Sequence, residues 1–77
     1  MKQVRVGMIG TGFVARLHID GWRRVHGVDV DVVAITSGHA ARAAAFAAEF
    51  GIARVHADAA AVIADPEVDL VDLCVPN

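Results

Sequence analysis

The residues of this chain that are best suited to chemistry are two glycines, Gly10 and Gly12, followed by the small residue Ala15. They join an apolar run to a segment with helical spacing of apolar residues. Glycines allow a tight turn, and the free amide groups at the start of a helix form a binding site for anions, above all phosphate. The pattern Gly-x-Gly-x-x-Ala therefore predicts either a phosphate cradle or only a tight turn.

Each residue of this loop has an expected task if a phosphate binds there. Gly10 makes the turn, and Gly12 lets the backbone approach the phosphate. The amide hydrogens of Gly12, Phe13 and Val14 point outward with the positive end of the helix dipole, and Thr11 lies between the glycines. The elements on either side decide whether this reading holds.

Two strands and two helices are predicted in the first fifty residues. A mostly apolar strand covers Val4–Ile9. A helix begins at Phe13 and ends at Gly27. Its predicted apolar face consists of Val14, Leu17, Trp22 (or Gly21) and Val25. The second strand covers Val28–Thr36. The second helix covers His39–Phe50 and buries Ala43, Phe46, Ala47 and Phe50.

The rest of the chain completes an alternating pattern. A brief strand is predicted at Arg54–His56, a short helix capped by Asp58 ends at Ala64, a turn covers Asp65–Glu67, and a fourth strand covers Val68–Val75. Crossovers of this length require parallel strands with right-handed connections. The predicted fold class is α/β, a doubly wound parallel sheet with strand order 3-2-1-4, the first portion of a Rossmann fold.

In this fold, a glycine loop after strand one favours a dinucleotide as ligand. NAD-binding proteins usually place an acidic residue at the end of strand two, but Ile35–Gly38 contains none. Ser37 can hydrogen-bond a ribose hydroxyl or a phosphate instead. Arg42, with His39 nearby, is placed to meet a 2′-phosphate, so NADP is expected at least as readily as NAD. The alternative is that Arg42 is a solvated helix residue.

Composition excludes several other classes of function. The net charge is −2 and the basic residues are scattered, so no nucleic-acid partner is expected. The single cysteine, Cys74, cannot form an internal disulfide and is expected to be small and buried. No signal peptide or membrane span is apparent, and we expect a cytoplasmic protein. His26, His39 and His56 share no ligand spacing, so no metal site is expected.

Two stretches resemble the Gfo/Idh/MocA oxidoreductases, the glucose–fructose oxidoreductase and inositol dehydrogenase family. They are Val6–Ala15, with His18 three residues on, and Asp65–Asn77 with its Asp-Pro-Glu-Val-Asp and Pro-Asn motifs. The resemblance implies cofactor contacts around the pyrophosphate and, at the end of the fourth strand, toward the nicotinamide. The residues implied are Gly10, Gly12, Phe13, Val14, Ser37, Val75, Pro76 and Asn77. Val75 departs from the family's frequent threonine.

The resemblance also implies what residues 1–77 lack. They correspond to the N-terminal part of a dinucleotide-binding domain, without the substrate domain and without the catalytic lysine of a Glu-Lys-Pro motif. No catalytic residue is therefore assigned, and His18 is expected to pack or to face solvent. The whole enzyme would transfer hydride between a nicotinamide and a sugar- or polyol-like secondary alcohol, and would be a homo-oligomer.

Two alternatives to an oxidoreductase remain. One is a non-catalytic dinucleotide-binding or regulatory module on the same fold. A Glu-Lys-Pro segment within a few tens of residues downstream would favour the enzyme over this module. The other is a methyltransferase that binds adenosylmethionine. Such enzymes usually carry an acidic residue at the end of strand two, where this chain has Thr36 and Ser37.

Overall fold

The computed structural model describes residues 3–74, which form a single four-stranded parallel sheet with three helices. The strand order is β3-β2-β1-β4, as predicted. The pairing of the two central strands shifts register between Val6 and Gly7, where a residue of the neighbouring strand is left over. In chain order the elements are β1 (Gln3–Ile9), α1 (Phe13–Arg23), β2 (Asp29–Thr36), α2 (Ala40–Phe50), β3 (Arg54–Val55), α3 (Ala59–Ala64) and β4 (Leu70–Leu73).

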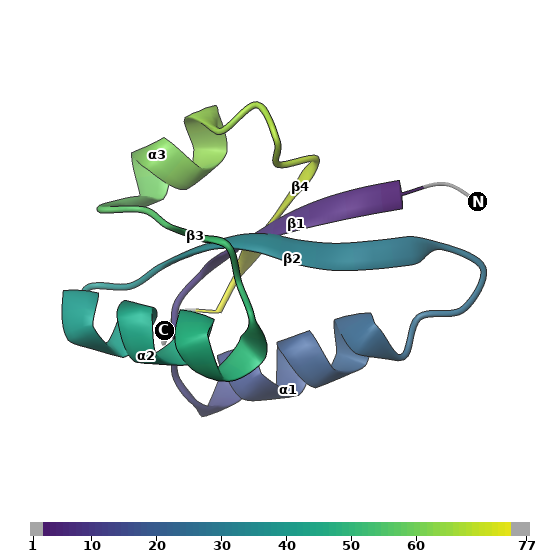
Figure 1. Ribbon diagram of the computed structural model, residues 1–77, viewed down its shortest axis with the longest axis horizontal. Helices are drawn as coiled ribbons and strands as arrows, with labels where there is room; N and C mark the ends of the chain where they lie inside the picture. Colours follow the sequence, from purple (N-terminus) through teal and green to yellow (C-terminus); the bar gives the residue numbers. More distant parts are fainter. Residues whose placement is uncertain (1–2, 75–77) are drawn as a thin grey trace.

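The helices cover the two faces of the sheet unequally. Helices α1 and α2 lie on one face, and the short helix α3 lies on the other (Figure 1). Met8, Ile19 and Ile35 are completely buried between the sheet and the first layer of helices. Helix α2 buries Ala43, Phe46 and Ala47, as its spacing predicts. Within residues 3–74, no helix is long and apolar enough to cross a membrane.

The predicted apolar face of α1 is mostly wrong: Trp22 packs against the core, but Val14, Leu17 and Val25 are exposed. Helix α1 packs on the sheet through Ala15 and Ile19, which are fully buried, whereas Val14 and Leu17 are 50% and 56% exposed. Both sets of residues recur at helical spacing, so periodicity did not distinguish them. The small side chain of Ala15 lets the helix approach the sheet closely at its start, and this contact fixes which face turns inward.

Two predicted element ends also differ from the structure. Helix α1 ends at Arg23 rather than at Gly27, because the amide of Arg24 donates to the carbonyl of Gly21 in a tightened last turn. Gly27 has a φ of +81° but lies in the loop beyond. Strand β4 is shorter than predicted, because the amide of Val68 donates to the carbonyl of Asp65 within the turn.

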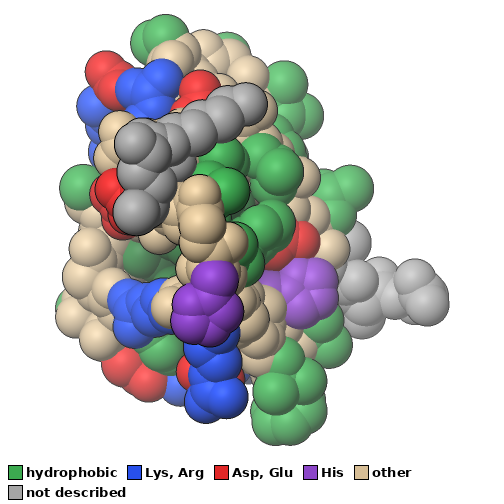
Figure 2. Space-filling view, turned by 90° about the vertical axis from the view of Figure 1, so that its right-hand side faces the viewer, with side chains coloured by type: hydrophobic (Ala, Val, Ile, Leu, Met, Phe, Trp, Pro, Cys, Tyr) green, Lys and Arg blue, Asp and Glu red, His purple; other side chains and the backbone are tan. Residues whose placement is uncertain are grey.

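The Asp-Pro-Glu-Val-Asp segment holds the start of β4 against β1. The guanidinium of Arg5 pairs with Glu67 and with Asp69, and the amide of Asp69 donates to the carbonyl of Arg5 at 2.7 Å. On the face of the molecule that Figure 2 shows, acidic and basic side chains lie next to each other, and hydrophobic side chains lie beside them. The segment therefore has a structural role in setting the register of β4.

Asp65, the first residue of that segment, is a buried carboxylate with three hydrogen-bond donors. It accepts hydrogen bonds from Arg54 at 2.9 Å, from Nε2 of His56 at 2.7 Å and from the amide of Glu67 at 2.8 Å. The hydrogen bonds from His56, from the Glu67 amide and from Arg54 lower the pKa of Asp65 to about 2. Asp65 thus connects β3 to the turn that precedes β4.

Helix α3 packs closely against the other face of the sheet because residue 7 of β1 is a glycine. A Cβ atom at Gly7 would lie 2.7 Å from a methyl group of Val62 and 3.1 Å from Val68. Helix α3 itself begins as predicted, with the Asp58 carboxylate accepting the amide of Ala61 at 2.8 Å.

Candidate cofactor site

The turn after β1 is built around Gly10, which adopts a φ of +116° that other residues rarely take. Its amide donates to the carbonyl of Thr36 at 2.8 Å, which ties the loop to the end of β2. A Cβ atom at this position would collide with the backbone of Cys74, whose carbonyl carbon would be 2.8 Å away. The fold itself therefore requires glycine at position 10.

Gly12 is different, because no atom of residues 3–74 requires it to be glycine. It is the N-cap of α1 with a φ of −74°, and a Cβ atom there would meet nothing within 4 Å in the described part of the chain. It has no side chain to accept a hydrogen bond from the amides of the first turn, which have no partner inside the helix. The open space and the uncapped amides form a cradle that suits an anion.

The loop after β2 lies beside the glycine loop. Oγ1 of Thr11 is 3.2 Å from Oγ of Ser37, and Oγ of Ser37 accepts a hydrogen bond from the amide of His39 at 3.2 Å. The two loops surround a pocket of about 430 Å³ at the carboxyl end of the strands, where ligands of open α/β sheets bind. It is lined by Gly10, Thr11, Gly12, Phe13, Val14, Ser37, Gly38, His39, Arg42 and Cys74.

Every described residue that the sequence assigns to cofactor binding lies at this pocket. The structure brings Ser37 and Arg42 to the glycine loop although more than twenty residues separate them in the chain. Val75, Pro76 and Asn77 lie outside the described residues. Gly38, His39 and Cys74 also line the pocket; of these, only His39 was considered as a phosphate contact from the sequence.

Arg42 contributes a positive charge to the lining of this pocket. It lies in the first turn of α2, on the exposed side of the helix. Within residues 3–74, no side chain pairs with its guanidinium, whereas the nearby Arg16 forms a bidentate pair with Glu49 at 2.6 and 2.8 Å. No carboxylate lines this pocket in the described part of the chain. An anion at this place would therefore meet an unpaired positive charge.

Cys74 forms part of the pocket wall, and its thiol is buried. It is 5% exposed, as predicted for a small buried residue. Burial, together with the nearby charge of Asp72, raises the pKa of its thiol to about 12. The thiol is consequently protonated at neutral pH, and its backbone is what confines Gly10.

The comparisons with known proteins identify the family of this chain. Residues 4–77 match the model of the oxidoreductase family with an NAD-binding Rossmann fold. D-apiose dehydrogenase of Paraburkholderia graminis is 34% identical over 73 residues, which are 95% of this chain and 19% of that protein. This chain therefore spans only about a fifth of the length of that relative.

Two solved structures share the arrangement of strands and helices. An NAD-binding oxidoreductase from Klebsiella pneumoniae has a TM-score of 0.85 at 30% identity and covers 97% of this chain, which spans 22% of that protein. Biliverdin reductase from Synechocystis, solved with biliverdin and NADP⁺, has a TM-score of 0.77 at 35% identity. The match covers 94% of this chain and 22% of the biliverdin reductase chain. The chain belongs to the Gfo/Idh/MocA oxidoreductase family and forms its NAD(P)-binding Rossmann domain.

Proposed function

We propose that the pocket between the glycine loop and Arg42 holds the phosphates and the adenosine ribose of NAD(P). The pyrophosphate would lie against the amides of Gly12, Phe13 and Val14, because these amides are uncapped and the space before them is open. Ser37 would hydrogen-bond the ribose or its phosphate, and Thr11 holds the Ser37 hydroxyl in place. One observation carries this proposal: a Cβ atom at Gly12 would project into space that no described residue fills.

NADP is the cofactor that this pocket favours. The described lining has no carboxylate to accept the ribose hydroxyls, and the guanidinium of Arg42 is available for a 2′-phosphate. A carboxylate here would repel a 2′-phosphate, whereas an arginine forms charge-assisted hydrogen bonds with it. The bound nicotinamide would supply the hydride chemistry, and the residues of this chain would bind and orient the cofactor.

We further propose that the reaction served by this site oxidises a secondary alcohol of a sugar or polyol, or reduces the corresponding ketone. The relative D-apiose dehydrogenase, by its name, acts on a sugar. No described residue is assigned to proton transfer, so the proposal gives this chain the role of positioning the cofactor. A panel of sugars and polyols offered with NADP⁺ and NAD⁺, followed by nicotinamide absorbance, tests the substrate class.

The pyrophosphate proposal is tested by Gly12→Asp. An aspartate at an N-cap is compatible with the local backbone and caps the first-turn amides, so the helix should be as stable as before. The same carboxylate would occupy the proposed phosphate position and repel it. NADPH titrations followed by nicotinamide fluorescence should show at least about tenfold weaker binding.

Ala60→Asp is the matched control, because it adds the same charge to the first turn of α3 at an exposed position outside the pocket. It should leave NADPH binding unchanged. Unchanged affinity in folded Gly12→Asp, or no saturable binding to the folded parent chain, would contradict the proposed site.

The NADP preference is tested by Arg42→Gln. Loss of a charge-assisted contact to a phosphate costs about 1.5–3 kcal/mol, so NADPH binding should weaken at least about tenfold. NADH, which has no 2′-phosphate, should be affected much less. Arg24→Gln is the control, since Arg24 is exposed and pairs only with Asp20 among the described residues. An equal effect of Arg42→Gln on both cofactors would refute the proposed contact.

A further inference from the structure

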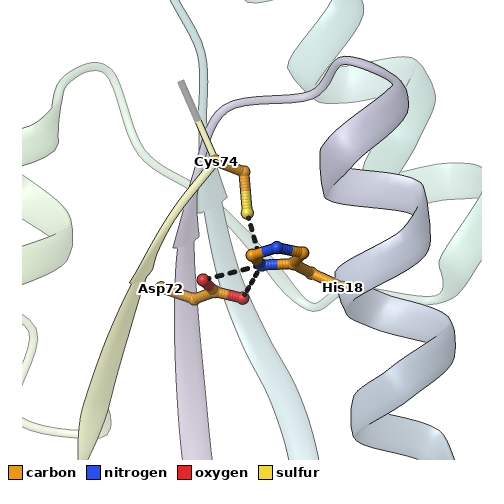
Figure 3. A group of neighbouring side chains, drawn as sticks. All are labelled: His18, Asp72 and Cys74. Atoms are coloured by element: carbon orange, nitrogen blue, oxygen red, sulfur yellow. Dashed lines mark hydrogen bonds and ion pairs between the residues drawn. The ribbon is translucent and has the colours of Figure 1, made fainter. Parts of the chain in front are cut away.

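A histidine, an aspartate and a cysteine meet where β4 ends beside α1 (Figure 3). Asp72 and Cys74 are two residues apart, so their side chains point to the same face of the sheet, and His18 reaches them from α1. Nδ1 of His18 lies 2.9 Å from both carboxylate oxygens of Asp72 and 3.2 Å from Sγ of Cys74. A nitrogen, an oxygen and a sulfur atom therefore lie within 4.8 Å of one another.

We propose that His18, Asp72 and Cys74 bind a divalent metal ion, and that Zn²⁺ fits them best. Zinc binds imidazole nitrogen, thiolate sulfur and carboxylate oxygen, whereas Mg²⁺ and Ca²⁺ prefer oxygen ligands alone. One thiolate and one carboxylate balance the charge of the ion. An electrically neutral site is favourable here because the Asp72 side chain is only 11% exposed and Cys74 is 5% exposed.

The surroundings of the three side chains also suit a metal. Nε1 of Trp22 donates to Oδ2 of Asp72 at 2.9 Å, which fixes the orientation of the carboxylate in the way that supporting hydrogen bonds fix metal ligands. A hollow of about 320 Å³, lined by His18, Gly21, Trp22, Val25 and Asp72, leads to the cluster from solvent. It leaves room for water as the fourth ligand of a tetrahedral ion.

The proton balance of binding follows from the hydrogen bonds. Without metal, Nδ1 of His18 and the Asp72 carboxylate form a hydrogen bond, in which the ring donates when its hydrogen is on Nδ1, and Cys74 is a thiol. When the ion binds, Nδ1 and Sγ each form a bond to it. The imidazole proton then resides on Nε2, and the thiol proton passes to solvent, so one proton is released per ion.

The test is a titration of the parent chain with Co²⁺, which takes the same ligands as Zn²⁺ and absorbs light. We expect one Co²⁺ per chain with a thiolate-to-cobalt charge-transfer band, which Zn²⁺ abolishes by competition. Cys74→Ser should lose the band, and Trp22→Phe, which keeps all three ligands, should weaken binding about 10-fold. His26→Gln is the control, because His26 is exposed and outside the cluster.

The result from the parent chain decides the proposal without depending on any variant. A folded parent chain that gives no charge-transfer band would show that the three side chains only hydrogen-bond to one another, and would overturn it. A band that persists in folded Cys74→Ser, with circular dichroism as the check of folding, would also overturn it. NADPH binding is measured separately, so failure of the cofactor proposal leaves this test unaffected.

Discussion

Gly10→Ala should destabilise the fold, whereas Gly12→Ser should not, although the two glycines belong to one motif. At Gly10 the alanine would have to adopt a φ of +116°, a strain of about 1–3 kcal/mol. Its Cβ atom would also press on the backbone of Cys74, and crowding of this kind costs about 1–3 kcal/mol more. The expected loss is therefore about 2–6 kcal/mol.

This loss is large for a chain of 77 residues, whose total stability is expected to be roughly 4–12 kcal/mol at 0.05–0.15 kcal/mol per residue. At Gly12 the backbone is already in the N-cap conformation and the space is open, so a serine should leave stability unchanged or raise it. The same serine would cap the amides that the proposed phosphate needs.

Urea unfolding followed by circular dichroism measures the difference. With a slope of about 1–2 kcal/mol per molar urea, Gly10→Ala should lower the midpoint by at least about 1 M, or leave the chain unfolded. Gly12→Ser should unfold near the parent midpoint. If the two variants were equally stable, the argument that Cys74 confines Gly10 would be wrong.

Three further predictions concern the packing around the site. The free energy of unfolding should fall between about pH 4 and pH 2, because the pKa of Asp65 is about 2 when folded and near 3.8 otherwise, so the unfolded state binds the proton more readily. Asp65→Asn should flatten this pH dependence in acid titrations of unfolding. Gly7→Ala should lower the free energy of unfolding by about 1–3 kcal/mol, because the added methyl group would press on Val62. In the double variant with Val62→Ala, part of this loss should be recovered, which a double-mutant cycle measured by urea unfolding would show. Thr36→Val should cost about 1–3 kcal/mol in thermal unfolding, because the buried Thr36 hydroxyl donates to the carbonyl of His56 at 2.8 Å; no loss would mean that water satisfies this carbonyl.

The fold and the glycine loop followed from local patterns in the sequence. Apolar runs of strand length alternated with segments of helical spacing, and the lengths of the connections left only parallel pairing. The order β3-β2-β1-β4 and the location of the glycines between β1 and α1 were therefore predicted correctly. The convergence of Thr11, Ser37 and Arg42 on one pocket follows from the same topology, because the carboxyl ends of parallel strands share an edge.

Only the tertiary structure supplied the contacts that constrain individual residues. The motif assigns Gly10 to the turn and Gly12 to the phosphate, but only the contact with Cys74, more than sixty residues away, shows that the fold requires glycine at position 10. The inward face of α1 was likewise set by the contact of Ala15 with the sheet and not by periodicity. The meeting of His18 with Asp72 and Cys74 has no local signal at all. Local propensity and spacing act within one element, whereas burial and contacts between distant segments exist only after the elements have packed.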